Sequence, residues 1–111
     1  MDDPVAQLIA RCAAQDRAAF GQLYRETSAK LFGTLLRILA NRSEAEDALQ
    51  EVYTKVWLRA GRFDSAKGRG MTWLIAIARN LAIDRLRARP PETSDDGIEM
   101  APDSAPRAEV R

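Results

Sequence analysis

Apolar residues recur every three or four positions along most of this chain, and that spacing constrains its fold more than any other feature. The clearest stretch is 44–60, where Leu49, Val52, Tyr53 and Val56 fall on one face of a helix. No segment shows the strict alternation of apolar and polar residues that a half-buried strand requires. The pattern predicts an all-α protein. With 111 residues, 46% of them hydrophobic, the chain can form one small domain with a limited core.

Capping residues predict where the first helices begin. Asp3 is followed by a proline, a combination that favours a helix start, and the apolar stretch VAQLIARCAA comes next. Asp16 can cap a second helix. Large apolar residues at helical spacing then predict a third helix from about Ser28 to Ala40.

Two further helices are expected on either side of a loop. Ser43 and Glu46 have the spacing of a capping box, so a helix should occupy about 44–60. Gly61 should end this helix, because turn-forming residues follow it. The last helix should occupy about 71–88. We therefore expect a compact bundle of four to five helices.

The C-terminal segment 90–111 differs in composition from the rest of the chain. It begins with two prolines, which prevent the last helix from continuing. It holds six acidic residues against two arginines and almost no large apolar side chains. Such a segment cannot bury enough surface to offset the entropy of folding. We expect residues 1–89 to form the helical domain and residues 90–111 to be a disordered acidic linker.

Charge is segregated along the chain, although its formal net charge is only +1. Residues 43–51 hold four acids and no base, whereas residues 59–89 hold eight bases and two acids. Blocks of opposite sign indicate two different partners, one with a basic surface and one that is polyanionic.

The residue inventory argues against catalysis and metal binding. The chain has no histidine and a single cysteine, Cys12, which we expect to be a small buried residue. The commonest general base and the usual zinc ligands are therefore missing. No apolar run approaches the ~20 residues of a membrane span, and the N-terminus does not resemble a secretory signal. We expect a cytoplasmic protein that is not an enzyme, does not enter a membrane and holds no metal or cofactor.

The last expected helix is apolar on two sides and polar along one narrow edge. At about 100° per residue, Trp73 lies at the loop end of that edge, and Asn80 and Arg87 lie further along it. A lone tryptophan is more often a core anchor. Here, however, Lys67 and Arg69 precede it, an arrangement suited to stacking on an unpaired base while cations hold phosphates.

The preceding helix has a polar face of a different kind. Asp47, Gln50, Glu51 and Thr54 cluster opposite its apolar stripe. Such a face is usually only solvated. Its acidic charge nevertheless fits docking on a basic protein surface.

The order of these motifs resembles region 2 of bacterial sigma factors of the extracytoplasmic-function group. The motif D-x-x-Q-E falls at 47–51, and T-W-L-x-x-I-A-R-N-x-x-x-D-x-x-R falls at 72–87. The resemblance covers residues 5–89. In that family a second domain with a helix-turn-helix for the −35 element follows a linker, and Arg111 would lie within such a linker.

The resemblance implies a role for each face. The first motif would dock on a coiled coil of the largest catalytic subunit of RNA polymerase core, through Asp47, Gln50 and Glu51. The loop and last helix would capture and open the promoter −10 element, with a flipped base of the single-stranded non-template strand held by the loop. An anti-sigma factor is an expected third partner. The implied DNA-binding residues are Phe63, Lys67, Arg69, Trp73, Arg79, Asn80, Asp84 and Arg87.

Two other functions remain open at this point. A free-standing helix-turn-helix regulator would bind duplex DNA, but its recognition helix would be exposed rather than apolar on two sides. A helical protein-interaction adaptor would have no nucleic-acid role, and its basic loop would simply be solvated. The three functions differ in whether the chain prefers single-stranded or duplex −10 DNA, and in whether its DNA binding depends on salt.

Overall fold

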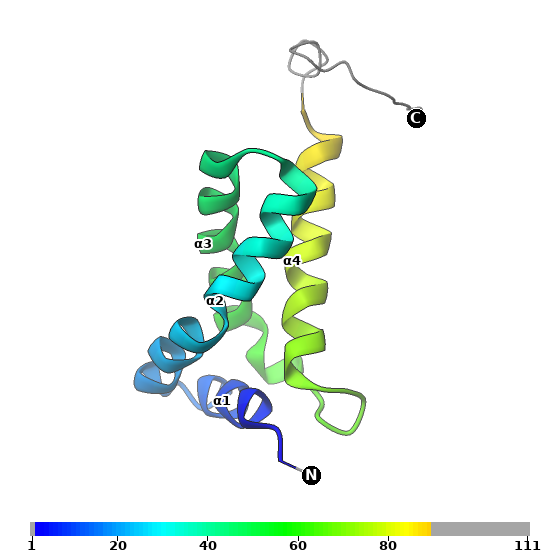
Figure 1. The fold of residues 1–111 in the computed structure, drawn as a ribbon. Helices are drawn as coiled ribbons and strands as arrows, with labels where there is room; N and C mark the ends of the chain where they lie inside the picture. Colours follow the sequence, from blue (N-terminus) through cyan, green and yellow to red (C-terminus); the bar gives the residue numbers. More distant parts are fainter. Residues whose placement is uncertain (1, 90–111) are drawn as a thin grey trace.

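The computed structural model describes residues 2–89, which form four α-helices and one short 3-10 helix, with no strand among them (Figure 1). The predicted all-α bundle is thereby confirmed, whereas the expected linker over 90–111 lies outside the described residues. The elements are α1 (Pro4–Ala13), α2 (Arg17–Leu39), α3 (Arg42–Arg59), η1 (Ala60–Arg62) and α4 (Gly70–Arg87).

The second and third predicted helices are a single helix, α2, so the expected start near Ser28 was wrong. The neighbouring Thr27 is buried and its hydroxyl donates a hydrogen bond of 2.7 Å to the carbonyl of Leu23. A polar residue bonded in this way is satisfied inside the helix, and the helix continues through it. Both predicted caps of the first two helices are confirmed, because Asp3 and Asp16 each accept a hydrogen bond from an amide of the first turn.

The start of α3 also differs from the prediction. Its N-cap is Asn41, whose Oδ1 accepts a hydrogen bond of 2.8 Å from the amide of Glu44. Ser43 lies inside the first turn, so the predicted capping box was wrong. Ala40, with a left-handed φ of 54°, turns the chain and leaves Asn41 extended, which is the backbone conformation that a cap requires. At the other end, Gly61 belongs to η1 rather than directly ending α3.

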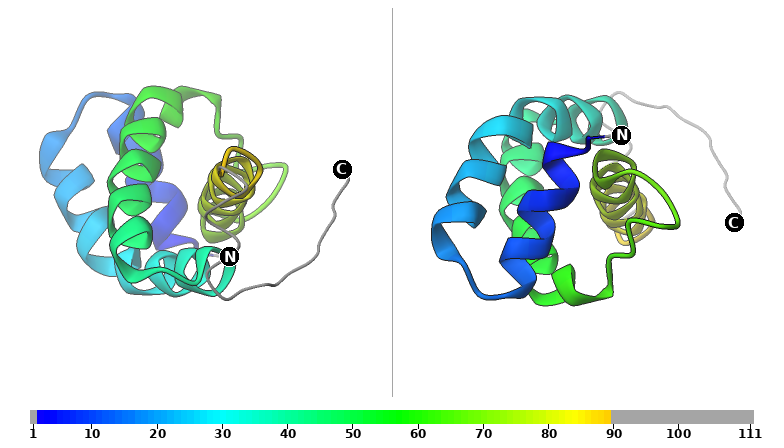
Figure 2. Two further views of the ribbon diagram at one scale, coloured as in Figure 1. Left: turned by 90° about the horizontal axis from the view of Figure 1, so that it is seen from above. Right: turned by 90° about the horizontal axis from the view of Figure 1, so that it is seen from below.

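The helices enclose one core. Figure 2 shows α1, α2 and α3 forming an arc, with α4 packed along its open side. The predicted stripe of α3 is buried, and Cys12 is completely buried as expected, which raises the pKa of its thiol. The largest completely buried side chains are Ile9, Leu23, Leu31, Leu35, Leu39, Val52, Val56 and Leu74.

Within residues 2–89, no helix is both long enough and apolar enough to cross a membrane. The same range contains no group of three cysteine or carboxylate side chains arranged to hold a metal ion.

Candidate functional site

Two acidic residues of α3, Asp47 and Glu51, lie on one exposed face beside the buried stripe of the same helix. The side chain of Asp47 is 80% exposed and that of Glu51 is 44% exposed, and Gln50 between them is also exposed. The structure thus brings the three predicted docking residues together at a surface.

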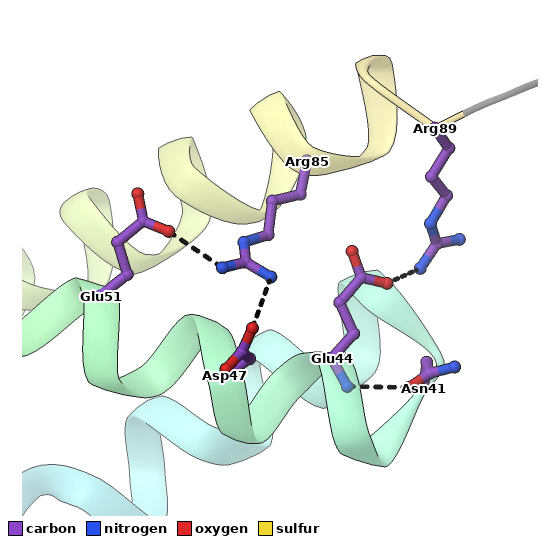
Figure 3. A network of polar contacts seen from close by, with 6 residues as sticks. All are labelled: Asn41, Glu44, Asp47, Glu51, Arg85 and Arg89. Atoms are coloured by element: carbon purple, nitrogen blue, oxygen red, sulfur yellow. Dashed lines mark hydrogen bonds and ion pairs between the residues drawn. The ribbon is translucent and has the colours of Figure 1, made fainter.

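A basic residue of α4 reaches this face. The Nη2 atom of Arg85 donates a hydrogen bond of 2.9 Å to Glu51, and its Nη1 atom lies 3.9 Å from Asp47 (Figure 3). The side chain of Arg85 is only 24% exposed. The charge of the acidic face is therefore partly balanced from within the chain, and sequence reasoning did not find this residue. The only sequence feature that pointed to this contact was the opposite charge of residues 43–51 and 59–89.

A second arginine fixes the end of α4. Arg89 donates a hydrogen bond of 2.6 Å to the carboxylate of Glu44 (Figure 3). It donates another of 2.7 Å to the carbonyl of Leu39. These contacts connect the residues after α4 to the turn between α2 and α3. The two arginines together fix α4 against α3 along the acidic face.

The loop before α4 projects from one end of the bundle (Figures 1 and 2). It begins at Phe63, whose ring centroid lies 5.4 Å from that of Trp73 on α4. Both rings are half-buried and pack against the core. Lys67 and Arg69 are exposed later in the loop, and Asp64 accepts a hydrogen bond from the amide of Ala66, which tightens the loop. The predicted aromatic pair thus joins the start of the loop to α4, and the two predicted cations are exposed on the same loop.

The predicted polar edge of α4 is exposed along its length. Asn80, Asp84 and Arg87 of that edge are exposed, and so is Arg79 outside it. One apolar side of α4 is buried, but on the other side Ile75 is half-buried and Leu86 is 37% exposed, so the expectation of burial on two sides was wrong. The edge runs from the loop toward the other end of the bundle. Together with the loop it forms a mainly basic surface, distinct from the acidic face of α3.

One apolar feature was missed. Leu58 on α3 is 75% exposed, although it is a large hydrophobic residue. It borders an open pocket of about 300 Å³ between the start of α2 and the end of α3. Leu58 follows Asp47, Glu51 and Thr54 at helical spacing, so it extends the exposed face of α3. The pocket is lined by Arg17, Phe20, Thr54, Trp57 and Leu58.

Comparison with known proteins adds evidence of a different kind. Residues 23–90 match the family described as Sigma-70 region 2. The chain is 40% identical over 80 residues to proteins named ECF RNA polymerase sigma factor SigK from Mycobacterium tuberculosis (strain ATCC 25618 / H37Rv) and Mycobacterium bovis (strain BCG / Pasteur 1173P2). These alignments cover 72% of this chain and 43% of each relative.

A protein of the same name from Mycobacterium ulcerans (strain Agy99) is 34% identical over 86 residues, which is 78% of this chain and 46% of that protein. The chain thus spans less than half the length of these relatives. The family match includes both sequence motifs and the loop between them. The chain therefore belongs to the sigma-70 region 2 family, in the extracytoplasmic-function group.

Proposed function

We propose that this chain is the part of a transcription initiation factor that binds RNA polymerase core and opens the promoter −10 element. The observation that carries the proposal is the separation of two charged surfaces on one rigid bundle. The acidic face lies on α3, and the basic loop and polar edge belong to α4. Each surface suits one partner, so both can be bound at once.

The docking role rests on the exposed face of α3. Asp47, Gln50 and Glu51 are exposed at helical spacing, as a contact with a coiled coil requires. Carboxylates at the rim of an interface mainly steer association and fix its register. A basic coiled coil of the largest polymerase subunit is the partner that fits this charge.

The DNA role rests on the loop and α4. The Phe63–Trp73 pair offers aromatic surface at the loop, and Lys67 and Arg69 are exposed in the same loop. Stacking on an aromatic ring is worth about 1–3 kcal/mol per base, and phosphate contacts add to it. These terms offset the few kcal/mol that flipping a base costs. Arg79, Asn80, Asp84 and Arg87 would contact the adjoining strand.

The packing of α4 favours single-stranded over duplex DNA. A recognition helix that enters the major groove must project from its domain, whereas α4 contacts α1, α2 and α3. One face of α4 is buried in the bundle, and nucleic acid can reach its other face together with the loop before it.

Further partners follow from the same surfaces. An anti-sigma protein would inhibit the factor by covering the acidic face or the loop, both of which are exposed. The site of action would be the cytoplasm, where polymerase and promoter DNA meet. The chain would act by binding alone, without catalysis or a cofactor.

Binding of −10 DNA tests the proposal. First, core polymerase together with this chain is used to select a promoter fragment from a randomised DNA pool. The affinity of the chain for the single non-template strand of that fragment is then compared with its affinity for the duplex. We expect the single strand to bind at least tenfold more tightly, roughly what one stacked base contributes. Tighter binding of the duplex would support a helix-turn-helix regulator instead.

The basic loop is tested in the same assay. Replacing Lys67 and Arg69 by alanine should weaken binding and lower its salt slope by about 0.7 for each lost phosphate contact. The matched control replaces Lys30 and Arg37, two exposed cations of α2, and should leave both quantities unchanged. If the loop variant left both the affinity and the salt slope intact, an adaptor without a nucleic-acid role would be favoured.

A further inference from the structure

The start of α4 is capped by a residue from the other end of the chain. Its own N-cap position, Arg69, provides no side-chain hydrogen bond. Instead, Oδ2 of Asp3 accepts a hydrogen bond of 2.9 Å from the amide of Gly70, 67 positions later in the sequence. The other oxygen of the same carboxylate accepts a hydrogen bond of 3.1 Å from the amide of Ala6 and so caps α1. One side chain therefore caps two helices.

Close packing accompanies this bond. Gly70 is buried, and a Cβ atom at this position would lie 2.7 Å from the amide nitrogen of Ala6 and 2.9 Å from a methyl carbon of Val5. Only glycine allows α1 to approach α4 so closely. Without Asp3, the amide of Gly70 would lose its acceptor at a partly buried position, which destabilises the fold.

The same helix also packs against the beginning of the loop. α1 contacts η1 as well as α4. A small open pocket of about 210 Å³ lies between them, lined by Ala6, Ala10 and Ala13 of α1 and by Ala60, Gly61, Phe63 and Ser65. Phe63, which opens the loop and packs on Trp73, belongs to that lining. Both ends of the loop are thus fixed to α1.

We propose that Asp3 is a positioning residue for the loop 63–69, because it fixes the point where the loop ends and α4 begins. The inference rests on the proposed DNA-binding function of this loop. The two exposed cations Lys67 and Arg69 stand within three residues of Gly70, so movement of that boundary moves them relative to Trp73. Asp3 touches no DNA in this account. It determines which base the loop accepts by holding the loop in one geometry.

The chain offers a matched pair of variants for the test. Asp3→Ser keeps a good cap for α1, since a serine oxygen can accept from the Ala6 amide, but its single oxygen cannot also reach Gly70. Asp16→Ser makes the same change at the cap of α2, where the second carboxylate oxygen bonds Arg11 of α1 and not α4. Asp3→Asn is a second variant of nearly unchanged size, in which one carboxylate oxygen becomes an amide donor.

The first measurement is amide hydrogen exchange in the 111-residue chain. Loss of a hydrogen bond to a charged acceptor should speed exchange at Gly70 by about tenfold in Asp3→Ser, while Asp16→Ser leaves it unchanged. Exchange at Gly70 that is equal in the two variants would overturn the inference. This result does not depend on DNA, so it stands apart from the proposed function.

The second measurement is base discrimination in the complex with core polymerase. Single-stranded −10 oligonucleotides that differ at one base are compared by fluorescence anisotropy. The ratio of the affinities for the best and the altered oligonucleotide should fall by about fivefold or more in Asp3→Ser and should stay unchanged in Asp16→Ser. The two variants are compared at equal melting temperatures. Unchanged discrimination in Asp3→Ser and Asp3→Asn, with the Lys67 and Arg69 variants still impaired, would reject the inference alone. Unimpaired Lys67 and Arg69 variants would reject the proposed function on which it rests.

Discussion

Arg85 on α4 donates a hydrogen bond of 2.9 Å to Glu51 on α3, and Asp47 lies 3.9 Å from the same guanidinium group. The helix that carries the proposed DNA contacts therefore also neutralises part of the proposed docking face. A basic partner surface that binds Glu51 has to compete with Arg85 for its carboxylate.

This competition predicts the effect of Arg85→Ala. Removing Arg85 leaves both carboxylates free for the partner, so affinity for core polymerase should rise about twofold to fivefold at low salt. Because Glu51 and Asp47 are exposed, the free energy of unfolding should change by less than about 1 kcal/mol. Titration of labelled chain with core polymerase measures the affinity.

The control for this variant is Arg79→Ala, which removes an exposed arginine from the same helix. Within residues 2–89, Arg79 forms no ion pair with a carboxylate. It should leave affinity for core polymerase unchanged. Weaker binding by Arg85→Ala would instead mean that Arg85 orients Glu51 for the partner.

Trp73 and Trp57 provide a comparison between packing and DNA contact. Each is half-buried, and each ring packs against a phenylalanine, Phe63 at 5.4 Å and Phe20 at 5.2 Å respectively. Replacing either tryptophan by alanine should lower the free energy of unfolding by about 1–3 kcal/mol. Only Trp73→Ala should also lose about tenfold in affinity for the single-stranded −10 oligonucleotide. An equal loss in Trp57→Ala would show that general destabilisation, rather than stacking, is being measured.

The corrected cap of α3 can be tested by stability alone. Asn41→Ala removes the acceptor for the Glu44 amide and should lower the free energy of unfolding by about 1 kcal/mol. Ser43→Ala, at the position that sequence reasoning favoured, should change it by less than about 0.5 kcal/mol. Urea denaturation followed by circular dichroism separates the two. The reverse ranking would restore Ser43 as the cap.

The raised pKa of Tyr53 predicts that the free energy of unfolding falls at high pH. Burial raises its pKa to about 12, although its hydroxyl also forms a hydrogen bond with Thr27, which acts in the opposite direction. The unfolded pKa is about 10, so the neutral form stabilises the fold below pH 10, and this contribution is lost as pH rises toward 12. The loss approaches about 1.4 kcal/mol per pH unit in that window.

Tyr53→Phe cannot ionise, so the variant should lose less stability than the unmodified chain between pH 10 and 12. The difference between their urea midpoints at each pH isolates this group from other titrating residues. Parallel pH profiles would show that Tyr53 keeps its ordinary pKa in the fold.

Local patterns were sufficient for the all-α class and for several helix features. The stripe of α3 and the cap at Asp16 depend on residues within a few positions of one another, and both were found. The missed cap at Asn41 depended on a backbone angle at Ala40 that the sequence does not display. The sequence predicted two helices that meet near Ser28, because the residues before it are polar, whereas α2 continues through them.

Long-range contacts could not be found in this way. Arg85 meets Glu51 across 34 positions, and Asp3 meets Gly70 across 67. Nothing in the sequence near Arg85 or Asp3 indicates its distant partner. Only the packing of the helices brings the two residues of each pair together. The exposed Leu58 was missed for the same reason, because its exposure depends on which face of α3 the bundle covers.

The most direct test of the whole account is binding to core polymerase by the double variant Asp47→Ala, Glu51→Ala. Its matched comparison is the double variant Lys67→Ala, Arg69→Ala, which changes the basic loop and leaves the face of α3 intact. If α3 is the docking face, the first variant should bind core polymerase at least about tenfold more weakly, and the second should bind it like the unmodified chain. Unchanged binding by the first variant would contradict the account, because the acidic face of α3 would then have no part in docking.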